Sequence, residues 1–181
     1  MAKDTLQIRW HGRGGQGAKT AAGMVAEVAV SAGQNAQAAP EYGAEREGAP
    51  IKAYTRISEE AIRQHDAIYY PGVVVVLDET LLETEDVEQG LTEDGVLLVN
   101  TKRSPKEVRK QLDLKGRTIY TIDATGIALE EIGRPIPNTV MIGALIKLTE
   151  AVDVDQIEKA IRKKFGAKLS KGMLDGNIKA V

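Results

Sequence analysis

Six residues near the N-terminus have the types and spacing of a phosphate-binding turn. They are Gly12, Arg13, Gly14, Gly15, Gln16 and Gly17, in which the glycines at positions 12, 14 and 17 match the pattern G-x-G-x-x-G. When such a turn follows a strand and precedes a helix, backbone N–H groups and the helix N-terminus can hold a phosphate. The alternative is that the glycines only permit a tight turn and close helix–strand packing, with Arg13 and Gln16 facing solvent or a partner. The spacing alone leaves both interpretations open.

A dinucleotide-binding turn needs one further residue, which this sequence lacks at the usual place. About 20 residues after the glycines, an acidic side chain at the end of the second strand normally holds a ribose. Here that region reads Gln-Ala-Ala-Pro over residues 37–40, and the nearest acid, Glu41, lies beyond the proline. This departure weighs against an autonomous dinucleotide-binding dehydrogenase, which we keep as an alternative.

Three polar residues directly follow apolar runs of the chain. They are Asp78, Asn100 and Asp123. Ligands of open α/β sheets bind at the carboxyl ends of parallel strands, where these side chains would gather. Each taken singly is better explained as a cap of the helix that follows.

The connector between residues 40 and 50 is the other unusual segment. It holds Glu41, Tyr42, Glu45 and Arg46 between two prolines. Exposed loops of this composition often contact another molecule, although a merely solvated turn remains the alternative.

Residues that commonly do redox or nucleophilic chemistry are scarce. The chain has no cysteine, so it cannot hold an iron–sulfur cluster by thiolates or form a disulfide. Its two histidines, His11 and His65, have no serine or carboxylate partner nearby in the sequence. We therefore assign no catalytic residue and no metal site.

The elements that must position these residues form an α/β pattern. Short runs of β-branched residues alternate with segments of helical periodicity, which predicts a three-layer, open, mostly parallel, Rossmann-like sheet with helices on both faces. We expect one domain over residues 1–181, with strands at 6–9, 35–39, 51–57, 73–77, 96–99 and 118–122. We expect helices at 18–32, 105–112, 125–132, 139–151 and 155–165, and a docking extension at 168–181.

One strand should run against its neighbours. The connector at 40–50 has too many glycines and prolines for a crossover helix. Without a crossover the chain cannot return to a parallel position, so strand 51–57 is expected to be antiparallel.

Charge and composition limit the partners. Lys plus Arg number 24 against 26 Asp plus Glu, a net charge of −2, with no Lys/Arg cluster of the size that nucleic-acid or anionic-membrane binding usually needs. The first ten residues contain Asp4, Gln7 and Arg9 where a signal peptide would be apolar. We expect a cytoplasmic protein.

The segment WHGRGGQGAKTA, residues 10–21, resembles the opening of the gamma subunit of 2-oxoacid:ferredoxin oxidoreductases, which also occurs as an internal domain of single-chain pyruvate:ferredoxin oxidoreductase. Further similar stretches follow in the same order at 37–50, 73–82, 123–125 and 133–144. The resemblance spans nearly the whole chain.

The resemblance implies a subunit of an enzyme that oxidatively decarboxylates a 2-oxoacid to an acyl-CoA and passes two electrons to ferredoxin or flavodoxin. Thiamine diphosphate with magnesium and [4Fe-4S] clusters would belong to alpha, beta and ferredoxin-like delta subunits. Coenzyme A would be a co-substrate, and this chain alone would be inactive.

The Trp-His-Gly-Arg opening and the Glu-Tyr-Gly-Ala-Glu-Arg loop look most like the pyruvate branch, with 2-oxoglutarate and branched-chain 2-oxoacids as alternatives. By the same resemblance, Arg13 and Gln16 would lie at the interface with the catalytic chains, near the path of coenzyme A. The glycine turn at 12–17, at a helix N-terminus, could then hold a coenzyme A phosphate. Glu41, Tyr42, Glu45 and Arg46 would lie at the interface with the catalytic chains. The remaining alternative is that this chain is a scaffold, bound by the other subunits but holding no ligand. It differs from the ligand-binding interpretation only in whether coenzyme A contacts this chain.

Overall fold

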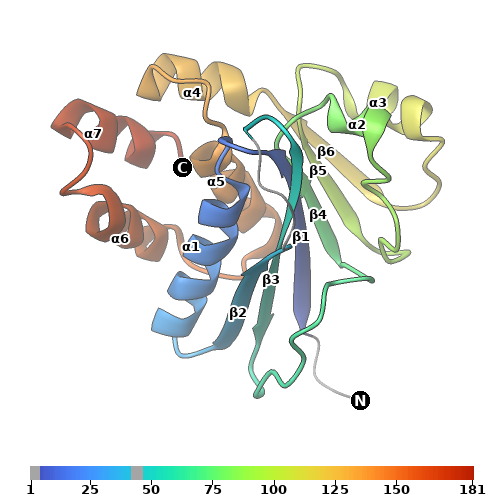
Figure 1. Cartoon of the computed structure of the whole chain (residues 1–181), viewed down its shortest axis with the longest axis horizontal. Coiled ribbons are helices and arrows are strands. Elements are labelled where there is room, and N and C mark those ends of the chain that lie inside the picture. The colour runs from blue at the N-terminus through green and yellow to red at the C-terminus, as the bar shows by residue number, and fades with distance from the viewer. Residues whose placement is uncertain (1–4, 42–46) are drawn as a thin grey trace.

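The computed structural model describes residues 5–41 and 47–181 and contains a six-stranded sheet of order β2-β3-β1-β4-β5-β6 (Figure 1). The strands are β1 (Leu6–Arg13), β2 (Asn35–Pro40), β3 (Pro50–Ser58), β4 (Val73–Val76), β5 (Val96–Asn100) and β6 (Thr118–Ile122). The helices are α1 (Ala18–Ser31), α2 (Leu81–Thr84), α3 (Pro105–Leu112), α4 (Ala124–Ile132), α5 (Asn138–Thr149), α6 (Val154–Phe165) and α7 (Lys171–Lys179). Tyr42, Glu45 and Arg46, expected at a partner interface, lie outside the described residues.

Only β3 runs against the other strands. It pairs antiparallel with both β1 and β2, whereas β1–β4, β4–β5 and β5–β6 are parallel pairs. The antiparallel expectation for residues 51–57 is therefore confirmed. The mostly parallel α/β fold is confirmed with it.

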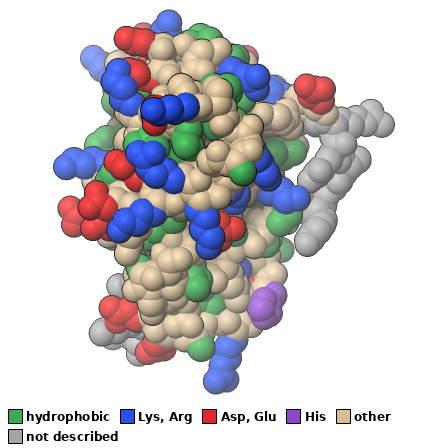
Figure 2. Space-filling view, turned by 90° about the vertical axis from the view of Figure 1, so that its left-hand side faces the viewer, with side chains coloured by type: hydrophobic (Ala, Val, Ile, Leu, Met, Phe, Trp, Pro, Cys, Tyr) green, Lys and Arg blue, Asp and Glu red, His purple; other side chains and the backbone are tan. Residues whose placement is uncertain are grey.

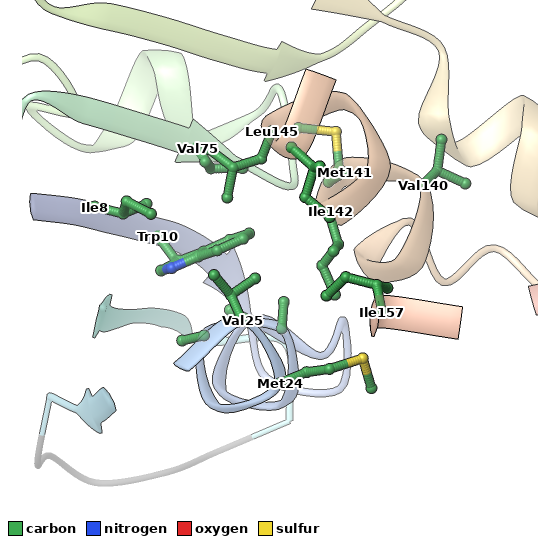
Figure 3. Packing of buried hydrophobic residues seen from close by; sticks show 14 of the residues in the cluster. Ile8, Trp10, Met24, Val25, Val75, Val140, Met141, Ile142, Leu145 and Ile157 are labelled. Atoms are coloured by element: carbon green, nitrogen blue, oxygen red, sulfur yellow. The ribbon is translucent and has the colours of Figure 1, made fainter. Parts of the chain in front are cut away.

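Helices cover the sheet on both faces, which makes three layers. On one face the core is formed with α1, α5 and α6, and Figure 3 shows Trp10 of β1 between Val25 of α1 and Val75 of the sheet, in the same cluster as side chains of α5 and α6. On the other face, side chains of α2 and α3 pack on alternate residues of β4 and β5. The four valines of β4 are all at most 4% exposed, as expected for a central strand buried on both sides.

Hydrogen bonds inside the core tie β1, β3 and α1 together. The indole Nε1 of Trp10 donates to Thr55 Oγ1 at 3.0 Å, and the Thr55 hydroxyl donates to the Ala22 carbonyl at 3.1 Å. Both side chains are fully buried. Their polar atoms are satisfied, as buried polar atoms must be if the core is to be stable.

The structure departs from the expected elements in three places. Strand β1 continues to Arg13 rather than ending at residue 9, because its pairing with β3 extends to Arg13 opposite Pro50. The one-turn helix α2 was not expected, since four residues are too few to show helical periodicity. The extension at 168–181 contains α7, which begins at the cap Ser170 and packs against α4 and α6.

Candidate functional site

The glycine turn lies at the carboxyl edge of the sheet, where β1 adjoins β4. The chain leaves β1 toward β2 and β3 on one side, and β4 begins the other half of the sheet, so this is a topological switch point where α/β proteins bind ligands. Gly15 and Gly17 have φ values of +96° and +84°. A Cβ on Gly17 would also lie 2.5 Å from Asn138 Nδ2, so only glycine fits there.

Gly17 is the N-cap of α1 and offers no side-chain acceptor to the helix. The first intrahelical bond runs from Ala21 N to Gly17 O at 2.9 Å. The N–H groups of the first turn therefore have no acceptor within the helix, and they lie at its partially positive end. This is the geometry that suits a phosphate oxygen.

Arg13 and Gln16 attach the turn to the segment after β4. Gln16 Nε2 donates to Asp78 Oδ2 at 2.6 Å, and its Oε1 accepts from Arg13 N at 2.8 Å. The Arg13 guanidinium donates to Thr80 Oγ1 at 3.1 and 2.7 Å and to the Gly48 carbonyl at 3.1 Å. Both side chains thus have partners within the chain, and they fix the position of the turn.

Asp78 is the acceptor on which these bonds converge. Besides the bond from Gln16, its Oδ1 accepts from the Thr80 hydroxyl at 2.6 Å and from Thr80 N at 3.0 Å, and Arg13 Nε lies 3.5 Å from its Oδ2. Burial alone would raise the pKa of Asp78, but the hydrogen bonds from Thr80 and Gln16 and the charge of Arg13 outweigh it and lower the pKa below its ordinary value. Asp78 is therefore an anion at neutral pH.

A cavity of about 500 Å³ adjoins the turn and the start of α1. Its charged lining consists of Lys19 and Lys52 together with Glu41 and Glu47. Lys52 Nζ also lies 3.7 Å from a carboxylate oxygen of Glu85. Three of the expected turn residues, Gly14, Gly15 and Gly17, line this cavity, whereas Arg13 and Gln16 point to the Asp78 side.

Asn100 and Asp123 hold the neighbouring strand ends. Asn100 Nδ2 donates to the Leu77 carbonyl and to Thr125 Oγ1, both at 2.8 Å. Asp123 is the N-cap of α4 and accepts from Gly126 N at 2.9 Å. For Asp123 the expected capping role is confirmed.

A buried pair of basic side chains on β1 was missed from the sequence. Arg9 Nε donates to His11 Nε2 at 3.0 Å, and the guanidinium also donates to the carbonyls of Val87 at 3.0 Å and Gln89 at 2.6 Å. Burial, with the charges of Arg9 and Lys52, lowers the pKa of His11 from 6.5 to about 3. The only signal was the alternation of Arg9 and His11 with buried apolar residues on the same strand.

Within residues 5–41 and 47–181, no three His, Asp or Glu side chains are grouped so that they could hold a metal ion. No helix in this part of the chain combines the length and apolar character needed to cross a membrane. The geometry offers a glycine turn at a helix N-terminus and an adjoining cavity, both positioned by a hydrogen-bonded sheet edge.

Similarity to known proteins gives this geometry a context. The family model of the pyruvate ferredoxin/flavodoxin oxidoreductases matches residues 7–181. The pyruvate synthase subunit PorC of Thermotoga maritima is 53% identical over 181 residues, which cover 100% of this chain and 93% of the relative. The common gamma subunit of the pyruvate/ketoisovalerate oxidoreductases of Pyrococcus abyssi is 51% identical over 91% of this chain and 89% of its own length.

A solved structure shows the same similarity at the level of the fold. The crystal structure of pyruvate oxidoreductase subunit PORC from Thermotoga maritima superimposes with a TM-score of 0.86 and 49% identity, over 98% of this chain and 93% of that one. The resemblance to gamma subunits inferred from the sequence is confirmed, and an autonomous dehydrogenase is not supported. The chain belongs to the pyruvate ferredoxin/flavodoxin oxidoreductase family.

Proposed function

We propose that the chain is the gamma subunit of a cytoplasmic, multi-chain pyruvate:ferredoxin or pyruvate:flavodoxin oxidoreductase. The complex would convert pyruvate and coenzyme A to acetyl-CoA and CO2 and pass two electrons to the acceptor protein. The observation that carries this proposal is the 53% identity, over the whole chain, to a protein named as a subunit of pyruvate synthase.

The redox chemistry belongs to other chains in this proposal. Thiamine diphosphate with magnesium and the [4Fe-4S] clusters would be held by alpha, beta and ferredoxin-like delta subunits. This chain has no cysteine to hold an iron–sulfur cluster, and its described part has no cluster of three metal-ligating side chains. Its own contribution is binding and positioning.

Coenzyme A is the ligand for which the glycine turn is suited. A phosphate placed at the start of α1 would accept hydrogen bonds from backbone N–H groups of the first turn. Because Lys19 and Lys52 offset Glu41 and Glu47 in the same cavity, the helix N-terminus would supply the net attraction. Arg13 would act as a positioning residue, since its guanidinium is bonded to Thr80 and the Gly48 carbonyl.

The segment that begins at Glu41 would contact the catalytic chains. Glu41 is exposed at the end of β2 and lines the cavity beside the turn. Tyr42, Glu45 and Arg46 continue the chain from that point. We assign these four residues to the interface on the resemblance of this segment to the gamma subunits; of the four, the structure describes Glu41, which lies beside the proposed phosphate site.

Anaerobic affinity purification of the tagged chain from its host tests the proposed assembly. We expect thiamine-binding and iron–sulfur chains to co-purify, and the preparation to reduce a viologen dye with pyruvate in a reaction that depends on coenzyme A. Recovery of the chain alone, without such activity, would refute the proposal.

A second candidate is a shared subunit that also serves a branched-chain 2-oxoacid oxidoreductase. The observation in its favour is the 51% identity to a gamma subunit named as common to pyruvate and ketoisovalerate enzymes. In that case two different sets of catalytic chains would co-purify, and 2-oxoisovalerate would be oxidised as well as pyruvate.

The coenzyme A contact is tested separately in the assembled complex. Arg13→Ala should raise the KM for coenzyme A about tenfold, with little change in the KM for pyruvate, because the turn loses its attachment to Thr80. Arg103→Ala is the matched control, since Arg103 pairs with Glu79 at 3.1 Å on the same sheet edge but away from the cavity. An unchanged KM for coenzyme A in Arg13→Ala would leave the turn with a structural role only.

A further inference from the structure

A groove separate from the glycine turn runs between α1, α6 and the edge strand β2. Its volume is about 970 Å³, and small side chains from all three elements form its floor, among them Ala26, Ala36 and Ala160. Val30 at its border is 54% exposed. Figure 2 looks onto this side of the molecule and shows hydrophobic side chains open to solvent between Lys and Arg side chains. The described chain leaves this apolar floor uncovered.

Gly23 lies on the floor of the groove, in the interior of α1. Glycine inside a helix is unfavourable relative to alanine. A Cβ at this position would meet nothing within 4 Å, so no contact inside the described chain requires a residue without a side chain. A partner that approaches the backbone of α1 closely would require one.

The border of the groove is basic. Residues 159–171 contain six Lys and Arg and no Asp or Glu, which leaves 24 − 6 = 18 cations against 26 anions in the rest of the chain. Three of these lysines line the groove together with a single acid, Glu27, which lies 3.5 Å from Lys164 Nζ. Lys159 and Lys163 are exposed and have no carboxylate within 4 Å in the part of the chain that the structure describes.

Helix stability explains only part of this pattern. Cations in the last turn of α6, such as Lys163, interact favourably with the helix dipole. Lys159 lies one turn earlier, where the helix dipole has little effect. The helix dipole also does not explain why the apolar floor of the groove is open to solvent. The lining residues of α1 at 23, 26, 27 and 30, and those of α6 at 156, 159, 160 and 163, have the spacing of one helix face each.

We propose that this groove docks an amphipathic helix of a partner chain, with acidic side chains facing Lys159 and Lys163 and a ridge of small apolar side chains on the floor. Two flanking helix faces and an apolar floor suit recognition of a helix in a groove. The basic border requires an acidic partner. A two-fold contact between copies of this chain would place lysines against lysines, which is unfavourable. The inference rests on the proposed function only in taking the partner to be another subunit of the complex.

The first test uses the full chain and a labelled synthetic helical peptide with alanine and leucine on one face and glutamates on both flanks. Fluorescence anisotropy should show that this acidic peptide binds about tenfold more tightly than the same peptide with lysines in place of the glutamates. The difference in affinity should be smaller at high salt. The combined substitution Lys159→Glu and Lys163→Glu should abolish this preference, and Lys106→Glu with Lys110→Glu on α3 should leave it intact. Equal binding of both peptides, or no effect of the first pair, would overturn the proposal.

Gly23 gives a variant that separates docking from folding. Gly23→Ala should raise the Tm of the isolated chain by about 2–4 °C, because alanine favours the helix and meets open space. Gly23→Leu should remain folded and weaken peptide binding about tenfold, because its side chain fills the floor. A Gly23→Leu chain that binds the acidic peptide as the unchanged chain does would contradict the role of the floor.

The second test identifies the natural occupant. In the purified, active complex, acetylation of Lys159 and Lys163 should be about tenfold slower than in the isolated chain, while Lys106 and Lys110 react equally in both. If acetylation is equally slow in a self-associated form of the isolated chain, a second copy of this chain covers the lysines, and the assignment to a partner chain is wrong. If the complex is active and both lysines stay reactive, the inference fails and the proposed function stands. If the chain purifies without partners, the proposed function fails and the peptide experiment decides the inference.

Discussion

The buried His11 should make the stability of this chain depend on pH well above the range in which carboxylates titrate. His11 Nε2 accepts a hydrogen bond from Arg9 Nε at 3.0 Å, and the side chain is 1% exposed. A proton on His11 would have to occupy that nitrogen and would face the Arg9 cation. Burial and the charges of Arg9 and Lys52 accordingly lower the pKa of His11 to about 3.

The size of the effect follows from linkage. Between pH 6.5 and 3 the unfolded chain binds a proton at His11 that the folded chain does not bind, so the free energy of unfolding decreases as the pH falls. One pKa unit corresponds to about 1.4 kcal/mol. With an unfolded pKa of 6.5 and a folded pKa of about 3, lowering the pH from about 7 to about 5 should cost roughly 2 kcal/mol.

Urea denaturation of the isolated chain at several pH values between about 5 and 7 measures this contribution. His11→Gln keeps an acceptor for Arg9 but cannot take up a proton, so its free energy of unfolding should vary with pH by roughly 2 kcal/mol less than that of the unchanged chain. His65→Gln is the matched control, because His65 is the other histidine and is exposed. The same pH dependence in His11→Gln as in the unchanged chain would show that His11 is not a buried neutral side chain.

Three further substitutions test other parts of the structure. Asp78→Asn should destabilise the chain by about 1–3 kcal/mol at pH 7 in urea denaturation, and less at low pH, because the lowered pKa of Asp78 makes its contribution present above about pH 4 and lost below it. Gly176→Ala should expose the C-terminal segment to limited proteolysis, since a Cβ there would collide with the Glu131 carbonyl, and an unchanged digestion pattern would contradict this packing. Thr55→Val should cost about 1–3 kcal/mol of unfolding free energy by leaving the indole N–H of Trp10 without an acceptor, whereas a cost near zero would mean that this bond is not formed.

Patterns that are local in the sequence predicted the fold well. The strand expected at 73–77, the helix expected after the glycine turn and the helix expected at 105–112 each appear in the structure close to where they were expected. Even the reversed direction of β3 followed from the composition of its connector. These features depend on residues a few positions apart, so the sequence displays them directly.

Features that depend on distant residues were missed. Strand β1 extends through Gly12 and Arg13 because β3 pairs with it across the sheet, and that pairing is not visible in residues 6–13 themselves. The partners of Arg13 lie 67 and 35 positions further along the chain, at Thr80 and Gly48. A guanidinium beside a glycine turn is therefore ambiguous from sequence, since the same residue type suits a phosphate or a remote hydroxyl.

The position of Asp78 explains how an anion can stand beside a proposed phosphate site. Its charge is directed toward Arg13, Gln16 and Thr80, which satisfy it from one side of the turn. The cavity on the other side has Lys19 as a lining residue and begins at the N-terminus of α1, whose first N–H groups have no acceptor within the helix. The charge of Asp78 therefore balances the charge of Arg13, which fixes the turn. The electrostatic field in the cavity is set by the N-terminus of α1 and by the residues that line the cavity.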